Sequence, residues 1–482
     1  MNKQQQIEEI LINLILQGNI LPGERLPSIR NVAAQYGVSL TPVAEAFRGL
    51  EDREIVYSRP NSGYFVSEDV FTLPEFASNK RQKTKLLVDQ FKLLNDRYSS
   101  YASISLNPAN DISTVLGSAA ASSYFYSEQH LYEHISRIAK EYVFQTNYQA
   151  YPKDDPELVN EIMKWMIPLK SSIFAEEISL TSSVLQAILL AVSSVTAPSG
   201  LVALEAPAFF GFIGILEFLK LRALFIPGDP VTGLDVSALE QALKNGARPD
   251  CLLVTSNFTN PTGALMPDRK KEYLVRLCRR YGVPIIEDDM LGEIYFGNDR
   301  PLPLKSFDNE NVMYISGFGK LLAPSLRMAW IAGGRCHPQI TTSKHLIGAF
   351  APPLVMKGFA AYMKSGDAQK HMRSFRNKCR EASEIYRDKI MAYFPEGTGV
   401  HPPEGGPYLW VSLPDGLGAS ELSDAARMHG VTIAPAQFFH APESQYNCFR
   451  ITCIATPWNN EVDAALLTVG NLAKSMLGPV KQ

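Results

Sequence analysis

The chain has 482 residues, and at roughly 150 residues per domain this length predicts two to four structural units. An apolar content of 46% and a charged content of 20% exclude an intrinsically disordered chain. The formal net charge of −3 excludes a polycation that binds nucleic acid through its overall charge.

Cysteine usage and the N-terminus point to the compartment. The six cysteines form no C-x-x-C pair and no regular spacing, which is typical of reduced thiols. The first ten residues, MNKQQQIEEI, lack an apolar signal segment, and the most apolar run, LQAILLAVSSV, is too short to span a bilayer. We therefore expect a soluble, cytoplasmic protein.

Three amphipathic helices are predicted before the segment IVYS (55–58). Apolar residues recur with a helical period over 4–17, Ser28 can cap a second helix that Gly37 ends, and Ser39 can cap a third. The side chains expected to face inward are Ile7, Ile10, Leu11, Leu14 and Ile15, then Ile29, Val32, Ala33 and Tyr36, then Val43, Ala46, Phe47 and Leu50.

The turn Gly37-Val38-Ser39 has the length expected of a helix-turn-helix. The segments IVYS (55–58) and YFVS (64–67), joined by RPNSG, predict a small hairpin, or wing. Residues 1–68 carry six cationic and eight acidic side chains, a net charge of −2, which counts against non-specific DNA binding. A reading helix needs only a local cationic cluster.

Residues 69–111 are interpreted as a linker that is partly helical and locally positive. After residue 112, helical stretches alternate with short apolar strands, which predicts a mostly parallel sheet covered on both faces, an α/β fold. The expected strands are LVALE (201–205), ALFIP (223–227), CLLVT (251–255), VPIIED (283–288) and VMYISG (312–317).

Chemically useful residues follow these strands at their carboxyl ends, where open α/β sheets bind ligands. They are Phe209 in EAPAFFG, Asn260 in NFTNPTG, Asp288 in IIEDDM, Lys320 in SGFGK, and Arg327 shortly after it. The helix start in LTSSVLQAI (180–188) offers free N–H groups for a phosphate. Alone, each has a simpler explanation: a solvated lysine, a turn, a helix cap or a core ring. Together they favour a pyridoxal phosphate site, which needs an amine, an anion, a stacking ring and a phosphate cradle.

The combination of motifs resembles known families. Residues 112–482 resemble the fold-type I aminotransferases through NPTG, EDD, the K-x6-R spacing of Lys320 and Arg327, PEGGPYLWV (403–411) and NCFRI (447–451). Residues 1–68 resemble the GntR winged helix-turn-helix through PGERLPSIRNVAAQYGVS and SRPNSGYFV. Their fusion in this order resembles the MocR subfamily of transcriptional regulators over essentially the whole chain.

The resemblance implies roles for residues of this chain. Lys320 would carry pyridoxal phosphate, Asp288 would partner the ring nitrogen, and Asn260 would bond the ring oxygen. Phe209 would stack on the ring, and Arg327, Ser183, Val184 and Ser316 would hold the phosphate. Arg450 matches the arginine that binds a substrate carboxylate. A large subdomain of about 155–335, a small one of about 112–154 and 336–482, and a homodimer are also implied.

For the DNA-binding module, the candidate phosphate or groove contacts are Arg30, Ser39, Thr41, Arg48, Arg59 and the backbone at Gly63. The alternative for each arginine is an ordinary surface charge. Leu40 stands where family members commonly carry a polar residue, and its side chain cannot read a guanine edge.

The cofactor site departs from the family pattern in three places. Met290 and Leu291 occupy the positions of the usual tyrosine, Gly319 replaces the usual serine before the lysine, and Ser183 and its apolar neighbours replace the usual phosphate turn. Each change removes a hydrogen bond of about 0.5–1.5 kcal/mol. We expect weaker cofactor retention and low transaminase turnover. His130 and His134 share a helix face without a third ligand, so no metal is expected.

These patterns favour a pyridoxal-phosphate-dependent regulator that binds an operator in double-stranded DNA and senses a small amino compound. One alternative is a working aminotransferase with an accessory DNA-binding head. Another is a regulator that has lost the cofactor.

Overall fold

The computed structural model describes residues 3–16, 20, 22–60, 62–67, 70, 114–142 and 153–477. The chain divides into two compact units, Met1–Phe91 and Lys92–Gln482, and each is described by itself. Except for Val70, the expected linker 69–111 lies outside the described residues. Val70 is buried in the core of the N-terminal unit.

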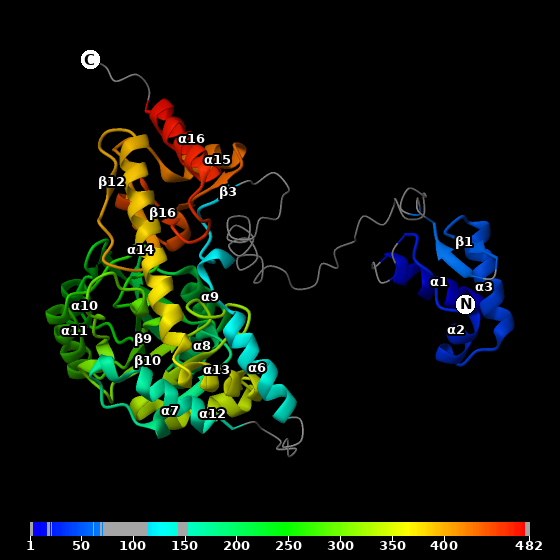
Figure 1. Ribbon diagram of the computed structural model, residues 1–482, viewed down its shortest axis with the longest axis horizontal. Coiled ribbons are helices and arrows are strands. Elements are labelled where there is room, and N and C mark those ends of the chain that lie inside the picture. Colours follow the sequence, from blue (N-terminus) through cyan, green and yellow to red (C-terminus); the bar gives the residue numbers. More distant parts are fainter. Residues whose placement is uncertain are drawn as a thin grey trace. The chain divides into compact units, whose positions relative to one another are not determined.

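The N-terminal unit has the expected helices and wing (Figure 1). Its elements are α1 (Lys3–Leu16), α2 (Ile29–Tyr36), α3 (Leu40–Asp52), β1 (Val56–Arg59) and β2 (Gly63–Val66). β1 and β2 pair antiparallel, from Val56 opposite Val66 to Arg59 opposite Gly63. The Ser28 side chain accepts a hydrogen bond from the Asn31 N–H, so the predicted cap of α2 is confirmed.

The core of this unit confirms most of the inward-facing residues, among them all four predicted on α3. The prediction for Tyr36 is wrong, because its side chain is 38% exposed. Tyr36 is the last residue of α2, and Gly37 turns the chain away in a left-handed conformation with φ of 63°. Ile10 and Ile29 are only half-buried, and the side chain of Leu14 lies outside the described part of the chain.

The second unit is built on a mixed sheet of eight strands in the order β4-β11-β10-β9-β8-β5-β6-β7. The five strands from β10 to β6 are parallel, and β11, β4 and β7 pair antiparallel at the two sides. This confirms the predicted α/β class. The strands are β4 (Ile178–Thr181), β5 (Leu201–Ala206), β6 (Arg222–Asp229), β7 (Gly233–Leu234), β8 (Cys251–Val254), β9 (Ile285–Asp288), β10 (Val312–Gly317) and β11 (Ala329–Ala332).

Helices cover both faces of this sheet. Alternate strand residues point to opposite faces, so Leu253 packs in one core and Leu252 in the other. The first core receives α8 (Val184–Val195), α9 (Phe210–Phe218) and α12 (His337–Leu346), and the second receives α10 (Val236–Lys244) and α11 (Asp268–Tyr281).

The remaining elements are a smaller sheet at one end of this unit and helices that lie beside both sheets (Figure 1). Four antiparallel strands follow the order β12-β13-β16-β15, and β14 pairs parallel with β3. The elements are β3 (Thr114–Val115), β12 (Gly399–Val400), β13 (Tyr408–Ser412), β14 (Val431–Thr432), β15 (Ala434–Pro435) and β16 (Cys448–Thr452), with α6 (Gln129–Tyr142), α7 (Pro156–Trp165), α13 (Pro353–Lys364), α14 (Asp367–Tyr393), α15 (Ala419–Met428) and α16 (Asn460–Met476).

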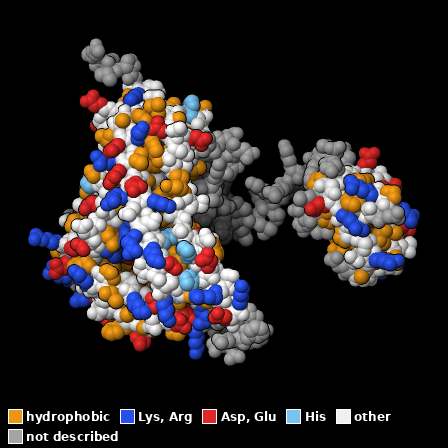
Figure 2. Space-filling model, in the orientation of Figure 1, with side chains coloured by type: hydrophobic (Ala, Val, Ile, Leu, Met, Phe, Trp, Pro, Cys, Tyr) orange, Lys and Arg blue, Asp and Glu red, His pale blue; other side chains and the backbone are white. Residues whose placement is uncertain are grey.

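The boundaries of the large and small subdomains stay predictions. α12, which lies beyond the predicted boundary at residue 335, packs against α8 and β4 of the large sheet. On the face seen in Figure 2, cationic and acidic side chains are interspersed with scattered apolar ones. Among the described helices, none is both long and apolar enough to cross a bilayer.

Candidate functional site

The helix-turn-helix exposes polar side chains around α3, together with the apolar Leu40, which is 51% exposed. Ser39, Thr41 and Arg48 are exposed on or just before this helix, and Arg30 is exposed on α2. Ser39 occupies the N-cap position of α3, but its side chain makes no capping hydrogen bond. The hydroxyl therefore keeps its donor and acceptor capacity at the helix start, where recognition helices contact DNA.

The wing carries a pre-oriented arginine. The Arg59 guanidinium lies 5.2 Å from the ring centre of Tyr57 and 4.5 Å from that of Phe65. Its Nη2 also donates to the Tyr57 hydroxyl at 2.7 Å. These contacts hold the exposed charge on the wing, which suits a phosphate or groove contact.

Arg25, which the sequence analysis did not single out, lies beside the tip of the wing. Gly63 is exposed and has φ of 94°, a conformation that favours glycine. A Cβ at Gly63 would lie 3.3 Å from Nε of Arg25, which pairs as a bridge with Phe65. Arg25 lies in a segment without helical or strand periodicity, so only the three-dimensional pairing places its charge beside the wing.

In the second unit, a cavity of about 380 Å³ opens beside Lys320. This volume lies in the range of roughly 300–1,000 Å³ that is usual for small-molecule sites. Its lining comes from strand ends and helix starts far apart in the sequence. The lining residues are Ala119, Ala120, Ala121, Tyr126, Ser183, Val184, Leu185, Phe209, Phe210, Phe212, Thr255, Asn260, Asp288, Met290, Leu291, Gly319, Lys320, Pro324, Arg327 and Met328.

Lys320 and Asp288 face this cavity from the ends of neighbouring strands, β10 and β9. The Lys320 amine lies 5.6 Å from the ring centre of Phe209. Burial raises the pKa of Asp288 to about 6, against the lowering effects of the Met290 N–H and the Lys320 charge. The Met290 N–H donates to Asp288 Oδ1 at 3.2 Å. The cavity thus holds an amine, a half-buried carboxyl and an aromatic face.

Asn260 lines the cavity, whereas Arg450 does not. Arg450 is 1% exposed and donates from Nη1 to Asn260 Oδ1 at 2.7 Å and from Nη2 to the Gly117 carbonyl at 2.6 Å. Its guanidinium also stacks on the rings of Tyr408 and Phe439, at 4.8 and 4.9 Å. The structure therefore places Arg450 behind Asn260, one residue removed from the cavity wall.

Three of the four predicted phosphate ligands line the cavity. Ser183 caps α8 by accepting from the Gln186 N–H at 3.1 Å, and Val184 begins that helix. The first N–H groups of a helix have no intrahelical acceptor, so this end suits an anion. Arg327 is exposed at the cavity rim, with φ of 48°.

Ser316 does not reach the cavity. It is 1% exposed within β10 and is absent from the lining. Its neighbour Ile315 packs on the α8 side of the sheet, and alternation turns Ser316 to the opposite face. The expectation that Ser316 helps to bind a phosphate is corrected on this ground.

The replacements noted in the sequence shape the cavity wall. Met290 and Leu291 line it and are 8% and 5% exposed. At Gly319 an added Cβ would meet no atom closer than 4.0 Å, so the missing side chain leaves open space. Tyr126, which sequence reasoning did not single out, lines the cavity and donates its hydroxyl to the Lys320 carbonyl at 3.0 Å.

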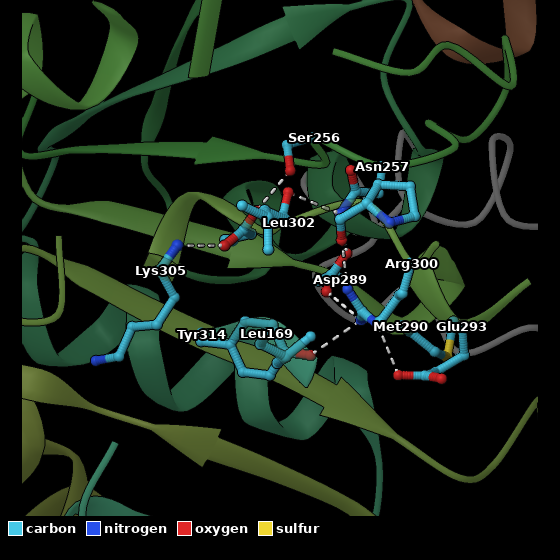
Figure 3. Close-up of polar contacts among 12 residues, drawn as sticks. Leu169, Ser256, Asn257, Asp289, Met290, Glu293, Arg300, Leu302, Lys305 and Tyr314 are labelled. Carbon is cyan, nitrogen blue, oxygen red and sulfur yellow. Dashed lines mark hydrogen bonds and ion pairs between the residues drawn. The ribbon is translucent and has the colours of Figure 1, made fainter. Parts of the chain in front are cut away.

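A buried polar network anchors the segment that follows β9 (Figure 3). Asp289 accepts from Arg300 Nη2 at 2.6 Å and from Asn257 Nδ2 at 2.7 Å, and Arg300 Nε donates to Glu293 at 2.8 Å. On the other side, Glu287 accepts from the Ser256 hydroxyl at 2.6 Å. With both neighbours held in the interior, Asp288 is the acid of this run that lines the cavity.

Among the residues that the structure describes, no group of three or more His, Cys, Asp or Glu side chains is placed to hold a metal ion. His134 lies 3.6 Å from Asp367, and His130 lies 3.2 Å from Glu133, so the two histidines have separate acidic partners.

Comparison with known proteins gives the family. Residues 120–468 match the aminotransferase class I and II family, and residues 3–66 match the gntR family of bacterial regulatory proteins. The uncharacterized HTH-type transcriptional regulator YdcR of Escherichia coli (strain K12) is 31% identical over 480 residues, which cover 99% of this chain and 100% of that protein.

Aminotransferases match a smaller share of the chain than the regulator YdcR does. The 2-aminoadipate transaminase of Thermus thermophilus is 28% identical over 317 residues, 63% of this chain and 77% of the enzyme. The crystal structure of LysN, an α-aminoadipate aminotransferase from the same organism complexed with N-(5'-phosphopyridoxyl)-L-leucine, shares the fold. It has a TM-score of 0.69 and 24% identity, covering 80% of this chain and 99% of that one.

Family membership also indicates the cofactor and a partner. The aminotransferase match indicates pyridoxal phosphate, and the gntR match indicates DNA binding by the N-terminal unit. The chain belongs to the class I and II aminotransferase family and, through its gntR-type helix-turn-helix, to the transcriptional regulators of MocR architecture.

Proposed function

We propose that the protein is a transcriptional regulator that binds pyridoxal phosphate and senses a small amino compound in the cavity beside Lys320. The observation that carries this proposal is the convergence of Lys320, Asp288, Phe209, Asn260 and Arg327 on one cavity, from separate segments of the chain. The donor set fits the cofactor, since it supplies an amine, a carboxyl, a ring, an amide and a cation.

Each residue has a distinct task in this proposal. Lys320 supplies the amine that attaches the cofactor, and Phe209 covers one face of the ring. Asp288 holds a proton on the ring nitrogen, because its carboxylate is more stable beside a positive charge than alone in its half-buried position. Arg327 and the first turn of α8 bind the phosphate. When bound, pyridoxal phosphate supplies an electrophilic carbon that an incoming amine can attack.

Sensing, rather than turnover, is favoured by the same cavity. Met290, Leu291 and Gly319 place apolar surface or open space where hydroxyl groups would otherwise bond the cofactor. Arg450 donates to Asn260 and to the Gly117 carbonyl and does not line the cavity. These features support weak cofactor retention and little transaminase activity.

The amine signal must reach DNA through a difference in affinity between two conformers of the protein. A homodimer would present two winged helix-turn-helix units to a repeated or palindromic operator. Light scattering of the purified protein tests the dimer.

The test of the proposed function uses the full-length protein. An operator is first selected from a library of random duplexes, and its dissociation constant is then measured by fluorescence anisotropy with pyridoxal phosphate, at fixed salt, with and without candidate amines. We expect an amine to change the affinity by roughly 5–150-fold, the usual range of coupling between sites. Lys320→Ala should keep the affinity for DNA and lose the response to the amine.

The competing function is a working aminotransferase with an accessory DNA-binding unit. The presence of Lys320 and Asp288 in one cavity supports this alternative. Turnover of an amino acid at roughly 1 s⁻¹ or faster, together with no sequence selected from the library, would favour that function over ours.

A further inference from the structure

We propose that three arginines of α14 form a binding site for a small anion that carries two phosphate groups. Arg373, Arg376 and Arg380 line one hollow of about 280 Å³ together with the segment 295–298. Of the described residues, none lines both this hollow and the cavity beside Lys320. The inference therefore goes beyond the proposed function and does not depend on it.

The three arginines share one side of α14, because they lie three and four residues apart. Arg373 and Arg380 are both exposed. The stretch Asp367–Arg380 contains five Lys or Arg residues and one acid. That acid is Asp367, which pairs with Lys370 at 3.1 Å. Like charges at this spacing destabilise a helix, so an anion that joins the cluster offsets a repulsion already present.

The charges of the cluster are poorly compensated within the chain. Arg373 and Arg380 make no hydrogen bond or ion pair with any residue that the structure describes. The Arg376 guanidinium lies 4.4 Å from the ring centre of Tyr295 and 4.0 Å from Glu293 Oε2. The other oxygen of Glu293 already accepts from Arg300 Nε at 2.8 Å. One long ion pair thus offsets only a small part of three positive charges.

The wall opposite α14 is anchored and adds neutral donors. The Phe296 N–H donates to the Glu404 carbonyl at 3.0 Å, which holds the segment 295–298 against the loop before β13. The exposed amide side chains of Asn298 and Asn377 line the hollow and can donate to an anion. Among the described residues of this lining, none is Asp or Glu. The hollow therefore repels no anion with a charge of its own.

The spacing and the volume indicate the class of anion. Arg373 and Arg380 lie seven residues apart, about 10 Å along the axis at 1.5 Å per residue. A single phosphate covers a small part of this span, whereas two linked phosphate groups offer oxygens to all three guanidinium groups, each of which can donate two parallel hydrogen bonds. A volume of about 280 Å³ is below the usual range of roughly 300–1,000 Å³ and favours a compact ligand.

The test uses calorimetry on the full-length protein with pyrophosphate and with inorganic phosphate, at equal ionic strength in metal-free buffer. Pyrophosphate should bind roughly tenfold more tightly than phosphate, since it adds charged hydrogen bonds. Arg373→Gln and Arg380→Gln should each weaken pyrophosphate binding by roughly tenfold. Because both side chains are exposed, the two variants should unfold at the wild-type temperature.

Two control variants locate the bound pyrophosphate. Arg280→Gln removes the same charge at an exposed position of α11, outside the lining of the hollow. Arg327→Gln removes a cation from the cavity beside Lys320, so it reports on pyrophosphate bound there instead. Both controls should leave the affinity for pyrophosphate unchanged.

Each outcome decides the inference. Tenfold weakening in both α14 variants, with both controls unchanged and phosphate the weaker ligand, supports it. No binding of pyrophosphate, equal affinity for phosphate, or any other pattern among the variants overturns it. If the α14 variants weaken the binding of operator DNA but not that of pyrophosphate, the arginines contact the DNA backbone and the inference is also overturned. None of these results changes the absorbance band of the cofactor, so the proposed function is tested separately.

Discussion

The buried Arg300–Asp289 pair should be far more important for stability than an exposed pair of the same chemistry. Their side chains are 5% and 0% exposed, and Nη2 and Oδ2 lie 2.6 Å apart. Arg300→Met leaves the buried Asp289 and Glu293 carboxylates without this cation. Removing one partner of a buried pair costs about 3–5 kcal/mol. Because Asn257 still donates to Asp289 at 2.7 Å, we expect the lower end, about 3 kcal/mol of unfolding free energy.

Arg276→Met is the matched control. Arg276 Nη2 lies 3.2 Å from Glu272 Oε1, and the two side chains are 67% and 50% exposed. The cost should therefore be that of an exposed pair, about 0–1 kcal/mol.

Urea unfolding followed by tryptophan fluorescence measures both variants. All four tryptophans lie in the second unit, so the signal does not report on the winged helix-turn-helix. The reasoning is refuted if the two variants lose equal stability, or if Arg300→Met loses less than Arg276→Met.

Three further predictions follow from the site, the core and the wing. At Gly319 a Cβ would lie no closer than 4.0 Å to the atoms around it, so Gly319→Ser should bind pyridoxal phosphate more tightly by about 1 kcal/mol in an absorbance titration. At Gly317 a Cβ would meet the Met328 carbonyl at 2.8 Å, so Gly317→Ser should instead destabilise the fold by about 1–3 kcal/mol. Equal cofactor affinity and equal stability of the two variants would be inconsistent with this geometry. Burial raises the pKa of Glu205 from 4.5 to about 8, so its stabilising contribution is present below pH 4.5 and is lost as the pH rises to 8. The free energy of unfolding of Glu205→Gln, relative to that of wild type, should therefore be higher at pH 8 than at pH 5 in urea unfolding. The same difference in unfolding free energy at both pH values would exclude Glu205 as the titrating group. Arg59→Ala should weaken DNA binding and reduce the salt slope of the association constant by about one, whereas Arg53→Ala, which removes an arginine 3.3 Å from Glu8, should leave the slope unchanged.

Much of the fold could be predicted because local signals agreed with the packing. Ser28 and Gly37 bound α2 as capping chemistry requires, with a side-chain cap and a left-handed turn. The apolar strands could be placed because both faces of the sheet are covered by helices. Parallel strands then bring their carboxyl ends to one edge, which is why Asp288 and Lys320 line the same cavity.

The parts of the site that could not be predicted depend on which way a side chain points and on contacts between residues far apart in the sequence. Ser316 lies four residues before Lys320, but sequence proximity does not say to which face of β10 its side chain turns. Arg450 reaches Asn260 across 190 residues, and Tyr126 reaches Lys320 across 194. No local pattern encodes such pairs. The cation of Asp289 was likewise unpredictable, since Arg300 lies in an irregular segment.

The most direct test of the central claim is the visible absorption spectrum of the full-length protein with added pyridoxal phosphate, recorded beside Lys320→Ala and Lys474→Ala. Lys474 is exposed on α16, so it controls for attachment of the cofactor to surface lysines. Our account predicts a cofactor band in wild type and in Lys474→Ala that Lys320→Ala lacks, and borohydride reduction followed by peptide mass analysis should find the label on Lys320. A band of equal strength in all three proteins, or in none, would contradict it.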